Sequence, residues 1–284
     1  MKNQVIVIIV NWDRSNDTIE CIQSVLNSDY PYIHLLLIDN GSSDEVFYKV
    51  NQRFPYIETI RLKENVGFAK AYNIGFNHAI EHGFTEILIL NNDVIIHPSA
   101  ISFLMSAKSD IAVPKILFYE KNNVIWSAGA KWKKFPPRVI IDGFNENDNP
   151  KYNQEKILQF ATACALLVKS EVISKIGGFD EDYISYFEDY DFTCRASRAG
   201  YKIAYVPKAI VFHKVSRSLG ENSYAKWYYL GRNSFLFYKK NNFPLSFSFY
   251  FLVWVLLREL FKMNFRSIIP FVRGAFFAIR EIKG

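Results

Sequence analysis

The feature that most constrains the fold is a short apolar run that recurs three times near the start of the chain. Residues 5–10 read Val-Ile-Val-Ile-Ile-Val, and residues 35–38 and 87–90 are similar. Runs of this length are typical of strands buried on both faces of a parallel sheet. The segments at 17–26 and 67–82 have helical patterns. This alternation over the first 95 residues predicts an α/β fold of Rossmann type, with a mostly parallel sheet.

Polar residues follow these strands at the point where each strand ends. Asn11-Trp12 follow the first strand, Asp39-Asn40-Gly41 the second, and Asn91-Asn92-Asp93 the strand at residues 87–90. In open α/β sheets, ligands bind in the crevice at the carboxyl ends of the strands. We therefore expect the three polar clusters to converge at one edge of the sheet and to form a ligand site there.

The pattern is less regular after residue 110. Short strands are expected at residues 111–113, 165–168, 203–206 and 209–212. A helix is expected at 189–199, and the chain after residue 224 has a helical, aromatic-rich pattern. The sequence therefore predicts an α/β domain at residues 1–225 and an amphipathic helical segment at 226–284.

Charge is distributed unevenly along the chain. The net charge is +6, but residues 1–200 carry 20 basic and 25 acidic side chains, whereas residues 201–284 carry 14 basic and 3 acidic ones. A basic, aromatic terminal segment suggests contact with an anionic partner, either nucleic acid or a membrane surface. The longest uncharged apolar run, residues 243–257, is shorter than the roughly 20 residues that span a bilayer.

The start of the chain and its cysteines indicate a cytoplasmic protein. Met1 to Gln4 lead directly into the first strand, without the pattern of a signal peptide. The three cysteines have no metal-ligand spacing and suit a reduced environment.

Asn91-Asn92-Asp93 is the first candidate for chemistry. A carboxylate beside amides at the end of a buried strand can hold a divalent cation, which in turn bridges a diphosphate. Asn and Asp are also common in ordinary turns, so this motif alone leaves both interpretations open.

Two further candidates lie in the second half of the chain. Glu188 and Asp189 stand between aromatic residues, which can raise the pKa of a carboxyl group and prepare a general base. The alternative is an acidic first turn of a helix, which the helix dipole stabilises. His213 follows an apolar stretch and is either a metal ligand or a partly buried structural histidine.

The order of the motifs is more specific than any one of them. The series consists of Ile8–Trp12, Leu37–Asp44, Glu64–Ala69, Leu90–Asp93, Gly177–Glu181, Phe187–Asp191, Arg195, Ala199–Tyr201, Val206–Pro207 and His213. Over residues 4–240, this series resembles the family 2 glycosyltransferases, in particular their rhamnosyltransferase-like branch.

The resemblance implies the A-type fold of nucleotide-diphospho-sugar transferases. It also implies inverting transfer of a sugar from a UDP- or dTDP-linked donor to a hydroxyl of a cell-envelope glycan or lipid-linked acceptor, as in polysaccharide, O-antigen or capsule biosynthesis. In this comparison Asp189 corresponds to the catalytic base, and Glu188 would orient the acceptor. Asp93 and His213 would hold Mg²⁺ or Mn²⁺. The positions implied to bind the nucleotide sugar are Asn11, Trp12, Asp39, Asn65, Gly67, Asn91, Asn92 and Arg232.

The chain departs from the family pattern at two positions. Asn91 stands where the strict metal motif has its first acid, which leaves one charge fewer for the cation. Ala163 stands where the family commonly has glycine, and its methyl group narrows the sugar or acceptor pocket.

The C-terminal segment has two interpretations. Residues 243–282 alternate apolar clusters with basic residues, which suits helices lying in the interface of an anionic membrane at the inner face of the plasma membrane. The alternative is a helical pair packed on the catalytic domain or on a second copy of the chain. The membrane interpretation accounts for the charge asymmetry.

A separate segment, the serine-rich residues 214–224, is a candidate lid over the donor.

Rival functions account for less of the sequence. A nucleotidyltransferase would show a glycine-rich basic phosphate loop near the N-terminus, which residues 10–14 do not form. A nucleic-acid binder would leave the acidic motifs of the first 200 residues unexplained. An inactive nucleotide-sugar-binding scaffold of an envelope-assembly complex is the remaining non-enzymatic alternative.

Overall fold

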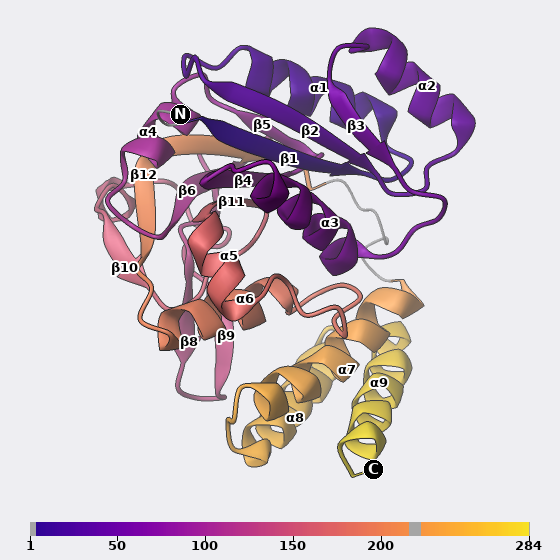
Figure 1. Cartoon of the computed structure of the whole chain (residues 1–284). Helices are drawn as coiled ribbons and strands as arrows, with labels where there is room; N and C mark the ends of the chain where they lie inside the picture. Colours follow the sequence, from indigo (N-terminus) through magenta and orange to yellow (C-terminus); the bar gives the residue numbers. More distant parts are fainter. Residues whose placement is uncertain (1–3, 216–222, 284) are drawn as a thin grey trace.

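The structure is a computed structural model that describes residues 4–215 and 223–283. A ten-stranded sheet forms its centre, and three helices at the C-terminal end of the chain lie together at one side of it (Figure 1). Most of segment 214–224, where a lid was expected, lies outside the described residues.

The N-terminal part of the sheet is parallel, as expected. Its strands are β1 (Val5–Asn11), β2 (Ile33–Asp39), β3 (Glu58–Arg61) and β4 (Glu86–Asn91), in the spatial order β4-β1-β2-β3. Helices α1 (Ser15–Leu26) and α2 (Asp44–Arg53) cover one face, and α3 (Phe68–Glu81) covers the other. Alternate residues of β1 pack into the two opposite clusters, which explains why every residue of the run is apolar.

The expectation of a mostly parallel sheet is wrong for the second half. Strand β11 (Ala165–Lys169) runs antiparallel between β4 and β6 (Ile111–Phe118). Parallel neighbours need a crossover connection, usually a helix. No α-helix lies between β6 and β11, so the chain returns in the opposite direction.

The strand predicted in two pieces at 203–206 and 209–212 is a single strand, β12 (Ile203–His213). It pairs parallel with β6, and its register shifts between Val206 and Ile210. Short antiparallel strands complete the sheet: β5 (Val94–Ile96), β7 (Ile125–Ser127) and β10 (Lys156–Leu158). Outside it, β8 (Ala130–Lys133) and β9 (Arg138–Ile141) form a separate two-stranded ribbon.

Short helices connect the strands of the second half. They are α4 (Ala100–Ser106), α5 (Ser170–Ile176) and α6 (Glu188–Arg198), together with a 3-10 turn at Pro150–Tyr152. Helix α6 begins at the two acidic residues singled out in the sequence, so these side chains lie in its first turn.

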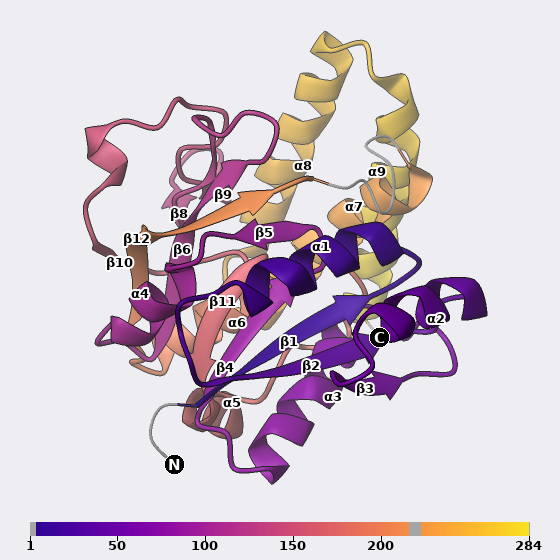
Figure 2. The ribbon, with the colours of Figure 1, turned by 90° about the horizontal axis from the view of Figure 1, so that it is seen from above.

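The C-terminal helices are α7 (Tyr224–Lys240), α8 (Leu245–Phe261) and α9 (Phe265–Lys283). Figure 2 shows α8 and α9 projecting from the rest of the molecule as a hairpin, with the turn between them at its far end. Helix α8 also packs on the β8–β9 ribbon, where the Arg138 guanidinium lies 3.9 Å from the centre of the Trp254 ring. None of the described helices combines the length and the apolar character needed to cross a bilayer.

Candidate active site

The register of the parallel strands brings the predicted polar residues together. Asn11 at the end of β1 is paired with Asp39 at the end of β2, and Val10 is paired with Asn91 at the end of β4. The three clusters therefore share one edge of the sheet, as expected from the rule for open α/β sheets.

Asn11 is the centre of a buried hydrogen-bond network. Its Nδ2 donates to Asp39 Oδ1 and to Ser42 Oγ, both at 3.1 Å. Its Oδ1 accepts from Thr18 Oγ1 at 2.8 Å, and Asn92 Nδ2 donates to the same hydroxyl at 3.0 Å. Asn11 thus holds the ends of neighbouring strands in fixed positions. Substituting it would disturb this network as well as any contact that Asn11 itself makes with a ligand.

Asp39 presents an acceptor at this edge. The residue is buried, and its Oδ2 has no hydrogen-bond partner within the described part of the chain. The Arg61 Nε atom lies 3.5 Å from this oxygen, at the limit of an ion pair. Buried polar atoms are rarely left unpaired, so Oδ2 is suited to accept a hydrogen bond from a ligand.

A second amide network supports the loop after β3. Asn40 Nδ2 donates to Asn65 Oδ1 at 3.0 Å, and Asn40 Oδ1 accepts from Val66 N at 2.9 Å. Asn65 Oδ1 also accepts from Gly67 N at 2.9 Å. Gly67 has a φ of 87°, which favours glycine, and it directly precedes α3. Asn65 and Gly67 therefore shape the wall of the site through the backbone.

Asp93 and His213 lie side by side although 120 positions separate them in the chain. The pairing of β12 with β5 places them together, with His213 Nε2 3.2 Å from Asp93 Oδ1. The His213 ring also meets the Trp126 ring edge-on at 4.4 Å. Nδ1 of His213 is buried and has no hydrogen-bond partner among the described residues.

This pair fits a divalent cation. Two ligands about 2.1 Å from an octahedral ion lie about 3 Å apart, close to the observed separation. Residues 4–215 and 223–283 contain no group of three or more His, Cys, Asp or Glu side chains arranged to hold a metal. The remaining positions would therefore be left for phosphate oxygens and water, the usual arrangement for Mg²⁺ at a phosphate site.

Asp189 has the properties of a general base. It is half-buried in the first turn of α6, where its Oδ1 accepts from Tyr190 N at 2.7 Å and its Oδ2 from Ala163 N at 3.3 Å. Burial raises the pKa of Asp189 to about 6, although a helix N-terminus favours the ionised form. A carboxyl group with this pKa is mostly ionised at neutral pH and binds a proton readily.

Glu188 is more buried than its neighbour. Burial, followed by the charge of Asp189, raises the pKa of Glu188 well above its usual value. Its Oε2 has no hydrogen-bond partner in the described chain. The environment of Glu188 therefore favours the neutral carboxyl, which can donate a hydrogen bond.

Asp189 is linked to the edge of the sheet through two successive residues. Ala163 N contacts Asp189, and the carbonyl of the next residue, Cys164, accepts from Asn91 N at 2.9 Å. The structure thus brings Asp189 close to the strand ends. It also places Ala163, the second departure from the family pattern, in direct contact with the Asp189 carboxylate.

The turn that leads into α6 is strained. Tyr186 and Phe187 have φ values of 70° and 74°, in the left-handed region that bulky residues avoid. Such conformations cost about 1–3 kcal/mol each and are found where the surrounding structure enforces them, often at functional sites.

The remaining predicted residues lie elsewhere around the site. Trp12 is exposed, with 39% of its surface accessible, and lies directly after β1. Arg232 lies on α7, where its Nη1 donates to the carbonyl of Asp182 at 2.7 Å. Arg232 therefore contacts the segment before α6, rather than the strand ends.

Sequence reasoning passed over several residues that the structure places at the site. Thr18 and Ser42 form hydrogen bonds with Asn11. Trp126 contacts the His213 ring, and Asn233 donates to the turn before α6. Ser42 lies within a motif already quoted, and Asn233 directly follows the predicted Arg232, whereas Thr18 and Trp126 are separated from any motif and have no local signal.

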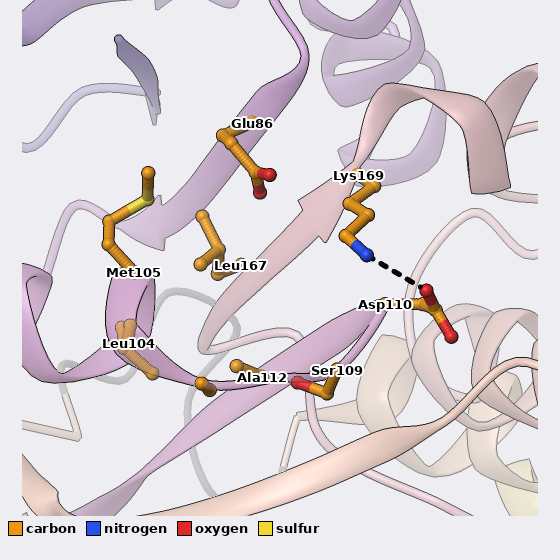
Figure 3. A pocket seen from close by; sticks show the side chains of 9 residues that line it. Glu86, Leu104, Met105, Ser109, Asp110, Ala112, Leu167 and Lys169 are labelled. Carbon is orange, nitrogen blue, oxygen red and sulfur yellow. Dashed lines mark hydrogen bonds and ion pairs between the residues drawn. The ribbon is translucent and has the colours of Figure 1, made fainter. Parts of the chain in front are cut away.

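Two cavities lie at the opposite edge of the sheet. One, of about 30 Å³, is lined by the first residue of β4, Glu86, and by the ion pair of Lys169 with Asp110, 3.0 Å apart (Figure 3). A larger one, of about 320 Å³, is lined by residues that include His34, Glu58 and His82. The first has room for about one or two waters and is too small for a sugar.

Solved structures with the same architecture identify the fold. A mannosyltransferase from Pyrobaculum calidifontis, in complex with GDP-Man and Mn²⁺, aligns with a TM-score of 0.58 at 15% identity, over 96% of this chain and 74% of that one. GalNAc-T7 with UDP, GalNAc and Mn²⁺ aligns with a TM-score of 0.59, also at 15% identity, over 74% of this chain and 43% of that one. The chain therefore has an A-type glycosyltransferase fold, with a mixed central sheet.

The sequence comparisons are more specific. The model of the family described as Glycosyl transferase family 2 matches residues 6–176. An N-acetylglucosaminyl-diphospho-decaprenol L-rhamnosyltransferase of Mycobacterium tuberculosis is 27% identical over 217 residues, covering 67% of this chain and 69% of the relative. A dTDP-rhamnosyl transferase of Shigella flexneri is 22% identical over 263 residues, covering 87% and 84%. The chain belongs to glycosyltransferase family 2, and the expected glycosyltransferase activity and rhamnosyltransferase-like character are confirmed.

Proposed function

We propose that this glycosyltransferase inverts the configuration of the transferred sugar, with Asp189 as the base. The donor is a UDP- or dTDP-linked sugar, and the acceptor is a hydroxyl of a cell-envelope glycan or a lipid-linked sugar. The observation that carries the proposal is the half-buried Asp189 carboxyl, whose pKa is raised to about 6, next to the ends of the strands. The names of the relatives favour dTDP-rhamnose as the first donor to test.

In the proposed reaction, Asp189 takes the proton of the acceptor hydroxyl. The hydroxyl oxygen forms a bond to the anomeric carbon while the bond from that carbon to the diphosphate oxygen breaks on the opposite face. Glu188, in its neutral form, donates a hydrogen bond that orients the acceptor. No second acid is needed, since the nucleoside diphosphate leaves as a stable anion.

The donor would be held at the strand ends. Asp39 Oδ2 is placed to accept from the imide N–H that uracil and thymine share, with Asn11, Trp12, Asn65 and Gly67 around the nucleoside. Asn91 and Asn92 would line the donor site beside the diphosphate. Arg232 would lie at the outer side of the donor site.

Asp93 and His213 would hold the Mg²⁺ or Mn²⁺. When bound, the cation offsets the negative charge of the diphosphate.

We also propose that the enzyme works at the cytoplasmic face of the membrane, where a lipid-linked acceptor is found. The exposed apolar and basic side chains of α8 and α9 support this location. The alternative is a homodimer through the same helices. Residues 1–225 would act as the catalytic domain and 226–284 as the attaching segment.

The first experiment separates donor binding from chemistry. Thermal unfolding is measured with UDP, dTDP, GDP and CDP, with and without Mn²⁺ or Mg²⁺, and turnover is measured with UDP- and dTDP-sugars. At 100 times its dissociation constant, a ligand adds about 2.7 kcal/mol of stability, which is easily detected. We expect a metal-dependent shift with UDP or dTDP, its loss in Asp93→Ala, and its persistence in Asp189→Asn, which has little turnover.

Each variant tests a different part of the proposal. Near-normal turnover of Asp189→Asn would exclude this residue as the base. A metal-dependent shift that survives in Asp93→Ala would exclude the proposed cation site. Binding without turnover of any donor in the wild-type protein would favour the inactive scaffold.

A further inference from the structure

Helix α7 contacts the chain just before the proposed base through polar side chains. Asn233 Nδ2 donates to the carbonyl of Ser185 at 2.7 Å and to the carbonyl of Tyr186 at 2.9 Å. Arg232, one position earlier, donates to the carbonyl of Asp182. The segment that carries the base is therefore bonded to a helix that begins about 40 residues later in the chain.

The two Asn233 bonds fall on the strained part of this segment. The carbonyls of Ser185 and Tyr186 belong to the peptide planes on either side of Tyr186. Fixing both planes fixes the backbone conformation of Tyr186, whose φ is 70°. The Asn233 side chain is fully buried, so water does not readily replace its two bonds.

The rest of α6 is attached to α7 by other contacts. Asn241, the residue directly after α7, donates from Nδ2 to Asp191 Oδ1 at 2.7 Å, and its carbonyl accepts from Arg198 Nη1 at 2.5 Å. Loss of the Asn233 amide would therefore free the turn while α6 stays docked.

We propose that Asn233 is a positioning residue for sugar transfer, which clamps the two peptide planes around Tyr186 and thereby sets the place of the Asp189 carboxyl. A strained conformation persists only where its surroundings enforce it, and the Asn233 amide supplies that constraint. The inference rests on the proposed role of Asp189 as base.

The test compares Asn233→Ala with Ser234→Ala. Ser234 is equally buried on the same helix, but its Oγ donates to the carbonyl of Gly231, within α7. Turnover is measured as release of nucleoside diphosphate from UDP- and dTDP-sugars, with water or a lipid-linked sugar as acceptor. A misplacement of a reacting group by about 1 Å can cost on the order of 100-fold in rate. We expect a loss of that size in kcat for Asn233→Ala, with unchanged affinity for UDP or dTDP, and near-normal kcat for Ser234→Ala.

A second substitution tests the clamp itself. Glycine adopts the left-handed region without steric cost, so Tyr186→Gly reduces the need for the Asn233 bonds. In the Tyr186→Gly background, Asn233→Ala is therefore expected to lower kcat by a smaller factor than in the wild-type background.

Four results would overturn the proposal. They are normal kcat in Asn233→Ala, a parallel loss of kcat and nucleotide affinity, an equal effect in both backgrounds, and a failure of Asn233→Ala to fold that Tyr186→Gly does not correct. Normal kcat in Asn233→Ala together with an inactive Asp189→Asn would reject this inference alone. An active Asp189→Asn would reject the base assignment as well.

Discussion

At the scale of single residues, the site holds two adjacent acids in surroundings that disfavour their charge. The folded-state pKa of Asp189 is about 6, above the ordinary value of 3.8. Below pH 3.8, Asp189 is protonated in both the folded and the unfolded protein, so its raised pKa does not lower the free energy of unfolding. As the pH rises from 3.8 to about 6, Asp189 loses its proton more readily in the unfolded protein than in the folded one. The free energy of unfolding therefore falls over this range.

Asp189→Asn is therefore expected to stabilise the protein. At pH 8 the free energy of unfolding should exceed that of the wild type by about 1–3 kcal/mol, since each pKa unit is worth about 1.4 kcal/mol. The difference should shrink toward zero near pH 4. Urea unfolding at both pH values checks this, with Glu120→Gln at an exposed loop position as control. A variant no more stable than the wild type at pH 8 would contradict the argument.

Residues of the site differ in how far the sequence reveals them. Asn11, Asp39 and Asp93 follow buried strands, so a local pattern locates them. His213 and Asn233 take their places through long-range contacts, a strand pair and a helix contact. Such contacts leave no trace in the local pattern, which therefore left two interpretations open for His213 and gave Asn233 no role.

At the scale of elements, α7 and α9 cross with their backbones in contact. A Cβ atom added to Gly231 would lie 2.0 Å from the Phe271 carbonyl oxygen, and one added to Gly274 would lie 2.0 Å from that of Tyr228. Because both obstacles are backbone atoms, a side chain cannot move aside to relieve the clash. The crossing requires glycine on each helix.

Gly274→Ala should therefore destabilise the protein, although alanine normally favours a helix by about 1 kcal/mol over glycine. We expect a loss of about 1–3 kcal/mol in the free energy of unfolding, the usual cost of overpacking. Ser246→Ala, at an exposed position of α8, is the control and should change stability little. An unchanged melting temperature in Gly274→Ala would show that α7 and α9 do not cross in this way.

The elements themselves were predictable where neighbours in sequence are neighbours in space. Strands β1 and β2 follow this rule, and their hydrophobic runs located them within a few residues. Strand β4 pairs with β1 from about 80 residues away, and its apolar run located the strand but not its partner. Strand β12 does not follow the rule either, because its partners β5 and β6 lie about 100 residues earlier. The sequence predicted two strands, at 203–206 and 209–212, whereas the structure has one strand with a shift in register.

At the scale of the whole molecule, the α8–α9 hairpin carries an apolar and basic surface. Phe261 and Met263 near its turn are 88% and 76% exposed. Lys262 and Arg266 lie beside them, also exposed. Apolar side chains flanked by cations suit insertion among anionic headgroups.

Binding to vesicles that contain anionic phospholipid tests this surface. The triple substitution Phe261→Ser, Met263→Ser and Phe265→Ser should reduce co-sedimentation, and 1 M salt should weaken binding of the wild type because it screens the cations. Ile157→Ser, which removes an exposed apolar side chain from the edge strand β10, should have no effect. Equal binding by the triple variant would exclude the hairpin turn, and a wild-type dimer without lipid binding would favour a second copy of the chain.

The antiparallel pairing of β12 with β5 has a consequence for the growing chain on the ribosome. Asp93 is synthesised in the first third of the protein, whereas His213 follows 120 residues later. Until β12 has left the exit tunnel, the two side chains cannot meet, and strands β5 and β10 lack the strand with which they pair. The two metal-ligand candidates of the nascent enzyme therefore come together only when β12 pairs with β5 and β6.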